Sequence, residues 1–260
     1  GPEKGEMACG EYGEGKMSSP RQIFVYLKNY FHQKNLVKNK NLKALITTGP
    51  TREYLDPVRY ISNESSGKQG YELALALKRL GVKTKLITGP TNLIHGNDLK
   101  IKKIISAKEM MDEVKKSLPV DIAICAAAVS DFKPIRKSKT KIKRKNFNEK
   151  NITLEKNPDI LDYLKKNNKA RPGIVVGFSA ETENVIHNSM TKIKEKHCDL
   201  IIANDVSRKS FGFNSDYNKV SIIDKNGKIK FIPKNKKSYI ANIIAKIILD
   251  KLLVNDKNFN

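Results

Sequence analysis

The sequence predicts an α/β protein with a doubly wound, mostly parallel sheet and a C-terminal antiparallel hairpin. From Leu42 onward, short apolar runs alternate with segments whose apolar residues recur at helical spacing, as in parallel strands joined by helices. The run at 121–127 is almost continuously apolar, which is typical of a strand buried on both faces. Asn226-Gly227 lies between two alternating runs, and this dipeptide is a strong hairpin signal.

The individual elements follow from this pattern in order. A strand at 44–48 precedes a helix at 68–80, on which Leu73, Leu77 and Leu80 share one face. A strand at 83–88 ends at Gly89-Pro90. The remaining expected elements are a strand at 100–105, a helix at 107–118, a strand at 121–127, a helix at 158–166 with Pro158 in its first turn, a strand at 174–178, a helix at 182–196, a strand at 200–203, hairpin strands at 219–223 and 228–232, and a closing helix at 236–253. Helices on both faces of the sheet would make the fold Rossmann-like.

Residues 1–40 do not continue this alternation. Gly10, Gly13 and Gly15 are expected to break any regular element there. A short helix is predicted over 20–31, and 34–40 resembles a polar linker. The polar tail at 255–260 should be frayed. We therefore expect two parts, residues 1–40 and a principal domain over 41–255.

The net charge of +23 has two interpretations. It could indicate a nucleic-acid partner, or it could reflect a lysine-rich composition imposed by an A- and T-rich genome. We favour the second because lysines are spread over every segment. One local cluster departs from that spread, and its members are Lys133, Arg136, Lys137, Lys139, Lys141, Lys143, Arg144 and Lys145. Aromatic residues do not interleave with it, which weakens the alternative of a nucleic-acid-binding module.

Several classes of protein are disfavoured by the composition. No apolar run approaches the ~18 residues that a membrane span requires, and the first residues lack the apolar region of a signal peptide. The three cysteines, Cys9, Cys125 and Cys198, are far apart and match neither a disulfide framework nor a zinc spacing. A cytoplasmic protein without a membrane partner is expected.

In open α/β sheets, ligands bind at the carboxyl ends of the strands, so the segments after strands are the candidate sites. The loop after the first strand lacks a G-x-G-x-x-G turn, which argues against the alternative of an NAD(P)-dependent Rossmann oxidoreductase. It ends instead in Ser65-Ser66-Gly67 at the start of a helix. Backbone N–H groups there favour an anion, although Ser65 or Ser66 could equally be an ordinary helix cap.

Further candidates follow the later strands. Ala127 lies in a run of alanines that would let a flat ring approach the backbone, and Asp131 could hold a metal or accept a hydrogen bond; tight helix–sheet packing would also explain the alanines. Lys141 and Lys143 would share one face of an extended segment. Phe178 could stack on a base or be an ordinary core residue. Lys192 and Lys196 are one helical turn apart and could face one anion.

The motifs together closely resemble bacterial phosphopantothenoylcysteine synthetase over roughly residues 41–253. The matching runs, in order, are Gly49-Pro50-Thr51-Arg52-Glu53, Asp56-Pro57-Val58-Arg59-Tyr60-Ile61-Ser62-Asn63, Ser65-Ser66-Gly67-Lys68, Ala126-Ala127-Ala128-Val129-Ser130-Asp131-Phe132, Lys141-Ile142-Lys143, Lys156-Asn157-Pro158-Asp159-Ile160, Val176-Gly177-Phe178-Ser179-Ala180-Glu181-Thr182, Ala203-Asn204-Asp205-Val206 and Gly212-Phe213-Asn214-Ser215-Asp216. The first of these runs are long and specific.

The N-terminus resembles a second protein. The run from Met7 to Met17 is similar to the closing stretch of the flavin-dependent phosphopantothenoylcysteine decarboxylase, which precedes the synthetase in bifunctional proteins. The resemblance implies that Cys9 is the proton donor of that decarboxylase. It also implies that residues 1–40 are the end of a decarboxylase domain plus a linker, and that FMN belongs to the part outside this chain.

The resemblance implies CTP-dependent ligation of 4'-phosphopantothenate with cysteine through an acyl-cytidylate, as a step of coenzyme A biosynthesis. Mg²⁺ is the expected metal, and Asp131 its expected protein ligand. A homodimer that pairs around Asp56 to Tyr60 is expected, with a larger assembly through the decarboxylase domain.

Site residues carry over position by position. Asn63 corresponds to the asparagine that holds the acyl-cytidylate, Arg59 supports its loop, and Lys141 contacts phosphate, with Lys139 and Lys143 as the alternatives. The remaining residues of the expected CTP site are Ser65, Ser66, Gly67, Ala127, Asp131, Asn157, Pro158, Asp159, Ile160, Phe178, Lys192 and Lys196.

Overall fold

The computed structural model of the protein describes residues 3–6, 9–94, 96, 99–143, 152–165, 168–206 and 215–257. Its centre is an eight-stranded sheet with the order β14-β13-β12-β11-β8-β3-β6-β7. The strands are β3 (Lys43–Thr48), β6 (Lys83–Thr88), β7 (Lys100–Lys103), β8 (Ile122–Cys125), β11 (Ile174–Glu181), β12 (Leu200–Asp205), β13 (Tyr217–Asp224) and β14 (Ile229–Lys236). Neighbours from β7 to β12 run parallel, and β13 and β14 add an antiparallel hairpin. The predicted α/β class and hairpin are confirmed.

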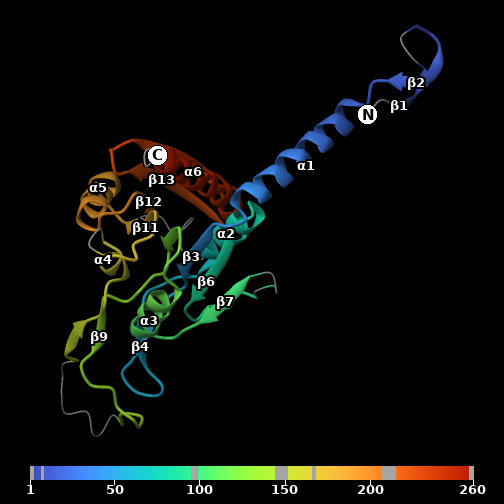
Figure 1. The fold of residues 1–260 in the computed structure, drawn as a ribbon. Helices are drawn as coiled ribbons and strands as arrows, with labels where there is room; N and C mark the ends of the chain where they lie inside the picture. Colours follow the sequence, from blue (N-terminus) through green and yellow to red (C-terminus); the bar gives the residue numbers. More distant parts are fainter. Residues whose placement is uncertain are drawn as a thin grey trace.

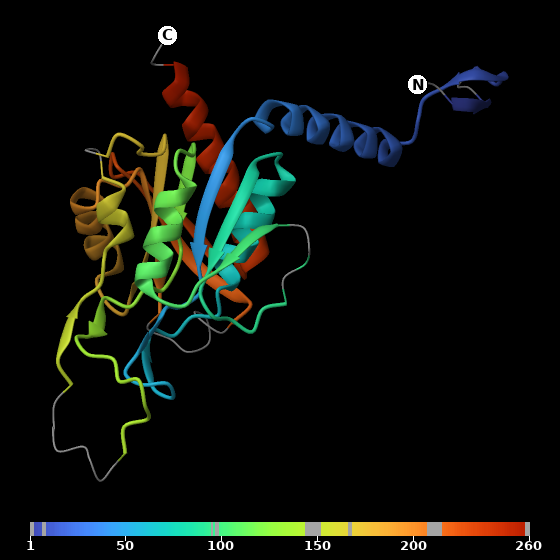
Figure 2. The same cartoon turned by 60° about the horizontal axis from the view of Figure 1, so that its bottom comes forward.

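Two layers of helices cover the sheet (Figures 1 and 2). One face buries α2 (Lys68–Arg79) and α6 (Lys237–Lys257) in a common core. The other face carries α3 (Ala107–Ser117), α4 (Ile160–Tyr163) and α5 (Val185–Glu195). Successive side chains of β3 point to opposite faces of the sheet. Ile46 packs into the core with α2 and α6, and Leu45 packs into the core with α3, α4 and α5. The expected burial of β8 on both faces is confirmed, since Ile122, Ala123 and Ile124 are at most 1% exposed.

The start of α2 lies against the end of β3. A Cβ atom added at Gly70 would lie 2.3 Å from Thr48 Oγ1, so the helix reaches this position only because residue 70 has no side chain. Leu73 and Leu77 then bury the face of α2 that the periodicity predicted. This contact fixes where the first turn of α2 stands relative to the carboxyl edge of the sheet.

Two small antiparallel sheets extend from that edge and were absent from the sequence prediction. One pairs β4 (Arg52–Tyr54) with β5 (Tyr60–Ser62), and the other pairs β9 (Phe132–Pro134) with β10 (Leu154–Lys156). Both lie at the end of the molecule away from α1 in Figures 1 and 2. Their strands are three residues long, which is too short for a readable alternation.

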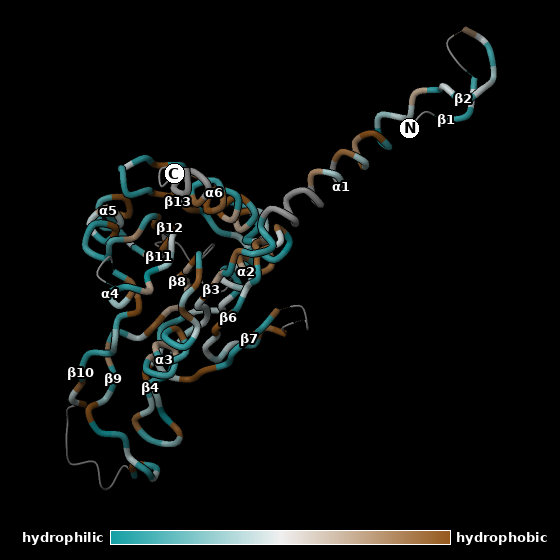
Figure 3. Tube along the Cα trace, in the orientation of Figure 1, coloured by the Kyte–Doolittle hydropathy of each residue, from teal (hydrophilic) through white to brown (hydrophobic). Residues whose placement is uncertain are grey.

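The N-terminal expectations were wrong in two respects. The segment with Gly10, Gly13 and Gly15 forms a hairpin of β1 (Glu3–Glu6) and β2 (Tyr12–Lys16), because glycine also fits exposed turns; Gly10 has a φ of 82°. The predicted polar linker is helical, since α1 runs over Pro20–Asn39 and its lysine and glutamine residues are good helix formers. Apolar side chains recur along this helix although it stands away from the sheet, and Phe24 and Tyr26 are exposed (Figure 3).

Other boundaries also differ from the prediction. Helix α4 has only four residues and begins after Asp159, whose side chain accepts a hydrogen bond from the Asp162 backbone N–H. Pro158 therefore precedes the cap instead of entering the first turn. Helix α6 continues to Lys257 through the first half of the tail that was expected to fray, and 258–260 lie outside the described residues.

Candidate active site

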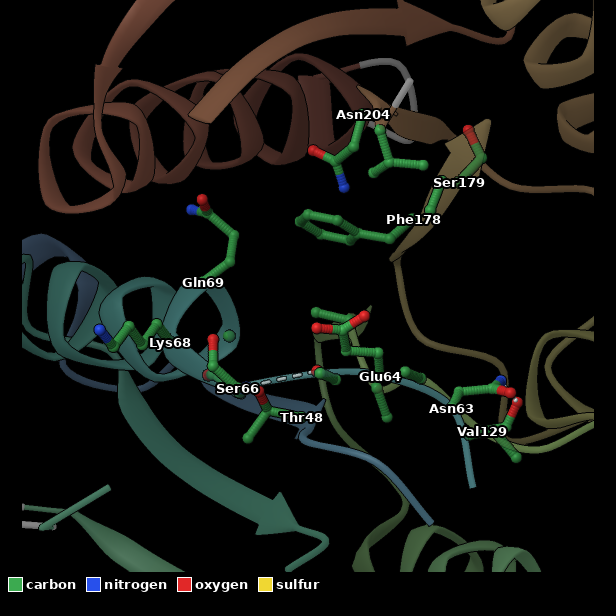
Figure 4. A pocket seen from close by; sticks show the side chains of 18 of the residues that line it. Thr48, Asn63, Glu64, Ser66, Lys68, Gln69, Val129, Phe178, Ser179 and Asn204 are labelled. Atoms are coloured by element: carbon green, nitrogen blue, oxygen red, sulfur yellow. Dashed lines mark hydrogen bonds between the residues drawn. The ribbon is translucent and has the colours of Figure 1, made fainter. Parts of the chain in front are cut away.

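A cavity of about 580 Å³ opens at the carboxyl ends of β3, β8, β11 and β12. Its walls come from the start of α2, the loop after β8, the end of β11, and the lysines of α5 and α6. In Figure 4, Phe178 and Asn204 lie across the cavity from Ser66 and Gln69. The full lining is Thr48, Ser62, Asn63, Glu64, Ser65, Ser66, Gly67, Lys68, Gln69, Gly70, Ala126, Ala127, Ala128, Val129, Asp131, Phe178, Ser179, Ala180, Lys192, Asn204, Val206, Asn218 and Lys237.

No side chain caps α2 within the described structure. The cap position is Gly67, with a φ of 73°, which is a left-handed conformation. Thr48 Oγ1 donates to the Gly67 carbonyl at 2.8 Å and holds the turn against β3. Ser65 Oγ accepts from the Gly67 N–H at 3.3 Å and does not cap the helix. The N-cap of α2 is therefore Gly67 and not Ser65, and the first turn lines the cavity through Lys68, Gln69 and Gly70.

Asn63 joins the loops that follow two neighbouring strands. Its Nδ2 donates to the Val129 carbonyl at 2.9 Å. The same loops meet again where Ser130 N–H donates to Thr51 Oγ1 at 2.9 Å. These contacts place the Asn63 amide on the cavity wall, with its carbonyl oxygen directed away from the Val129 bond.

An aromatic ring, two amides and an ammonium group converge on the opposite wall. Lys192 Nζ donates to the backbone carbonyl of Phe178 at 3.0 Å, which holds the ammonium at the end of β11. Asn218 is 3% exposed, and its Nδ2 donates to Asn204 Oδ1 at 2.9 Å. A flat ring beside fixed amides and a cation suits a base joined to a phosphate.

Asp131 lines the cavity, whereas Asn157 supports it from behind. Asn157 N–H donates to the Asp131 carbonyl at 2.8 Å, and its Nδ2 donates to the Ser130 carbonyl at 2.9 Å. Within the described residues no three His, Cys, Asp or Glu side chains form a metal cluster. A cation with few protein ligands fits this donor set, because Mg²⁺ is commonly held by one or two carboxylates and substrate phosphates.

Lys196 does not join Lys192 at the cavity. Its Nζ lies 2.8 Å from Asp159 Oδ2, and hydrogen bonding to Asp159 raises the Lys196 pKa despite burial. Asp159 itself caps α4, and Ile160 is buried in the core of that layer. Pro158, Asp159, Ile160 and Lys196 thus lie outside the cavity lining.

Arg59 and Lys141 lie on the extended loops instead of at this cavity. Asp56 is fully buried, and Arg59 Nη2 contacts its carboxylate at 2.6 Å and the Ile142 carbonyl at 2.7 Å. The Ile142 N–H also donates to Asp56 at 3.2 Å. Lys141, next to Ile142, is therefore held by the loop of Arg59. Arg144 and Lys145, and residues 212–214 of the last motif, lie outside the described residues.

The three cysteines occupy separate environments, and all are free thiols. Cys9 is exposed in the turn between β1 and β2, and these two strands lie at the end of α1 that is distant from the central sheet (Figure 1). Burial raises the pKa of Cys198 to about 12 and raises that of Cys125 further. Both buried thiols therefore remain neutral near pH 7.

A family model described as the C-terminal domain of the DNA/pantothenate metabolism flavoprotein matches residues 39–252. The chain belongs to this family.

Curated members of the family are similar over almost the whole chain. The coenzyme A biosynthesis bifunctional protein CoaBC of Haemophilus influenzae is 41% identical over 95% of this chain and 61% of its own length. The protein of the same name from Borreliella burgdorferi is 43% identical over 95% of this chain and 62% of its own length. The chain thus spans about three fifths of the length of these relatives.

Solved structures share the fold. A crystal structure of the C-terminal domain of CoaBC has a TM-score of 0.69 and 33% identity, covering 84% of this chain and 97% of its own. A Cab2 mutant in complex with phosphopantothenate-cysteine has a TM-score of 0.65 over 92% of this chain and 97% of its own, but only 16% identity, so it shows the fold alone. None of the helices in the described part of the chain combines the length and apolarity needed to cross a bilayer.

Sequence reasoning missed part of the wall of this flavoprotein-family domain. Gln69, Asn218 and Lys237 line the cavity without belonging to a motif that suggested a role. Asn218 and Lys237 follow the last parallel strand, where the sequence was read only as a hairpin and a closing helix. Lys237 is unusual because it is a buried lysine at the start of a helix. The sequence alone does not show this burial, so it gave no signal for Lys237.

Proposed function

We propose that the chain is the phosphopantothenate–cysteine ligase domain of a coenzyme A biosynthesis protein and that it uses CTP. The observation that carries this proposal is 41–43% identity over 95% of the chain to proteins named for coenzyme A biosynthesis. The cavity at the carboxyl edge supports it, because a ring, amides and lysines gather there.

The proposed reaction has two steps. The phosphopantothenate carboxylate attacks the α-phosphorus of CTP, the bond to the β-phosphate breaks, and pyrophosphate leaves with its electrons. The cysteine amine then attacks the acyl carbon of the acyl-cytidylate, CMP leaves, and the amine loses its proton. Each attack concentrates negative charge on oxygen, which fixed donors stabilise.

The residues on the cavity wall have matching proposed roles. Phe178 stacks on the base, and Lys192, whose ammonium is held at the cavity by the Phe178 backbone carbonyl, contacts phosphate. Asn63 holds the acyl-cytidylate from a position fixed by its bond to Val129. Ser65, Ser66 and Gly67 present hydroxyl and N–H donors to an anion. Asp131 would hold Mg²⁺, which supplies charge neutralisation for the phosphates when it is bound.

We place the proposed roles of Lys141 and Arg59 in a homodimer, in which these residues would serve the cavity of the second subunit. They lie on loops that Asp56 ties together, outside the cavity lining of their own chain. A second copy that pairs through residues 56–60 could bring Lys141 to the neighbouring cavity. The proposed reaction would then need both subunits.

Residues 1–40 are proposed to be the end of a decarboxylase domain with its linker, and 41–255 the ligase domain. In the full-length protein, Cys9 would donate the proton of the decarboxylation, FMN would bind in the other domain, and a larger assembly could form there. The free thiols fit a reducing, cytoplasmic compartment.

Pyrophosphate release tests the proposal directly. The protein is mixed with Mg²⁺, phosphopantothenate and either CTP or ATP, first without and then with cysteine. We expect pyrophosphate with CTP, and CMP together with the amide product only after cysteine is added. Absence of pyrophosphate above background with both nucleotides would refute the ligase assignment, and preference for ATP would refute the CTP assignment alone.

A further inference from the structure

A group of donors and cations lies on the cavity wall formed by α2 and α6. Lys68 and Lys237 are the first residues of these two helices, and both line the cavity. The helix starts are adjacent, since Gln69 Nε2 contacts the Lys237 carbonyl at 3.4 Å. Two helices that begin at one cavity each direct N–H groups and a partial positive charge toward it.

Lys237 is nearly completely buried, with 5% of its surface exposed. Burial, together with the nearby charge of Lys68, lowers the pKa of Lys237 to about 8, while Asp216 acts in the opposite direction. Asp216 is bound by Lys68 at 2.6 Å, and its side chain is 73% exposed. An ammonium group in such surroundings is unfavourable in the free protein, and an anion in the cavity would stabilise it.

This group and Lys192 come from opposite helix layers of the sheet. Helices α2 and α6 pack on one face, whereas α5 packs on the other. Both groups line the one cavity at the carboxyl edge of the sheet, and Figure 4 shows Gln69 and Phe178 on opposite sides of it. Because the two cationic groups come from opposite layers, they suit the two ends of a long ligand.

We propose that Lys237, with Lys68 and the start of α2, binds the terminal phosphomonoester of the acid substrate, and that Lys192 and Phe178 serve the nucleotide. The inference rests on the proposed function and specifies it further. Phosphopantothenate carries its carboxylate at one end and its phosphate at the other. Its carboxylate must reach the α-phosphate of the nucleotide, which leaves its own phosphate at the opposite wall. Ser65, Ser66 and the N–H groups after Gly67 then serve that monoester and not the triphosphate.

The test compares two acids in two variants. Phosphopantothenate and unphosphorylated pantothenate are assayed by pyrophosphate release with wild type, Lys237→Gln and Lys236→Gln. Lys236 is the exposed residue next to Lys237. The Lys236→Gln substitution therefore removes the same formal charge outside the cavity. For Lys237→Gln we expect the KM for phosphopantothenate to rise about 10- to 100-fold, with the KM for CTP and the rate with pantothenate unchanged. Lys236→Gln should match wild type.

A binding measurement separates this inference from the proposed function. Phosphopantothenate without nucleotide should raise the Tm of wild type and Lys236→Gln but not that of Lys237→Gln. Wild type that binds this acid without releasing pyrophosphate would refute the ligase assignment and leave the phosphate subsite standing. A higher KM for CTP, or equal losses with both acids, would overturn the subsite. If Lys237→Gln does not melt cooperatively, Lys68→Gln should show the same change in KM to a smaller extent, and an unchanged KM would overturn the inference.

Discussion

Asp56 shows how one buried carboxylate organises two loops. It accepts hydrogen bonds from the N–H groups of Val58, Arg59 and Ile142 and from the Arg59 guanidinium. Burial alone would raise the pKa of Asp56, but these hydrogen bonds outweigh it and hold the pKa far below the ordinary 3.8. The charged carboxylate is thus the form that the folded protein stabilises.

The pH dependence of stability should reveal this group. Because its native pKa is lowered, Asp56 stabilises the fold fully above the unfolded pKa, and this contribution is lost as pH falls below about 4. Asp56→Asn should therefore lower the urea midpoint of unfolding at pH 7. The difference in urea midpoint between this variant and wild type should shrink as the pH is lowered from about 5. Asp250→Asn, on the exposed face of α6, serves as the control. A difference that stays constant down to about pH 3 would contradict this role.

At the scale of single residues, the sequence predicted several of the side chains that line the cavity, but it did not predict which side chains pair with one another. Asn63, Ser65 and Asp131 lie in loops after strands, whereas Phe178 lies in β11 and Lys192 in α5. All five line the cavity. Lys196 could not be separated from Lys192 by spacing, because its ion pair with Asp159 depends on where the short helix α4 packs. The roles themselves remain predictions.

At the scale of elements, the contact between α2 and β3 gives a prediction with an unusual sign. Helix propensity alone would make Gly70→Ala stabilising by about 1 kcal/mol. The new methyl group would overlap Thr48, with Oγ1 only 2.3 Å away, and overpacking of this kind costs about 1–3 kcal/mol. We expect the Tm to fall by several degrees, whereas Lys78→Ala on the exposed face of the same helix should change it little. A higher Tm for Gly70→Ala would show that the start of α2 can shift.

The elements that sequence analysis recovered are those with a long, regular pattern. The helix over 68–80 carries four turns of periodicity, and the strand at 121–127 carries an unbroken apolar run. The small sheets of β4, β5, β9 and β10 were missed because three residues show no period and because their pairing depends on loops brought together by Asp56. Helix α1 was underestimated because lysine-rich helices and linkers have similar compositions.

For the whole molecule, the position of Lys141 predicts complementation between two defective chains. Asn63→Asp and Lys141→Gln should each lower turnover by about two orders of magnitude or more. If Lys141 serves the partner's cavity, a heterodimer of the two variants contains one site with both native residues. An equal mixture after subunit exchange should then recover about one quarter of wild-type turnover, because about half of the dimers are mixed.

Lys137→Gln provides the matched control on the same basic run. Lys137 is exposed and lies over the Tyr54 ring at 5.3 Å, where water and salt screen its charge. This variant should keep nearly full turnover alone. No recovery in the mixture of Asn63→Asp and Lys141→Gln would mean that Lys141 acts within its own chain or not at all.

The cavity wall spans the chain from Thr48 to Lys237, which has a consequence for how the site comes into being. During synthesis, the first strands and α2 leave the ribosome long before α6 does, yet the wall stays incomplete until α6 docks beside α2. A nascent chain that already carries the motifs of the first two thirds would therefore have no affinity for the acid substrate. Binding of the acid substrate should appear abruptly once α6 has emerged. The substrate can therefore stabilise only the finished domain and cannot assist the folding of the nascent chain.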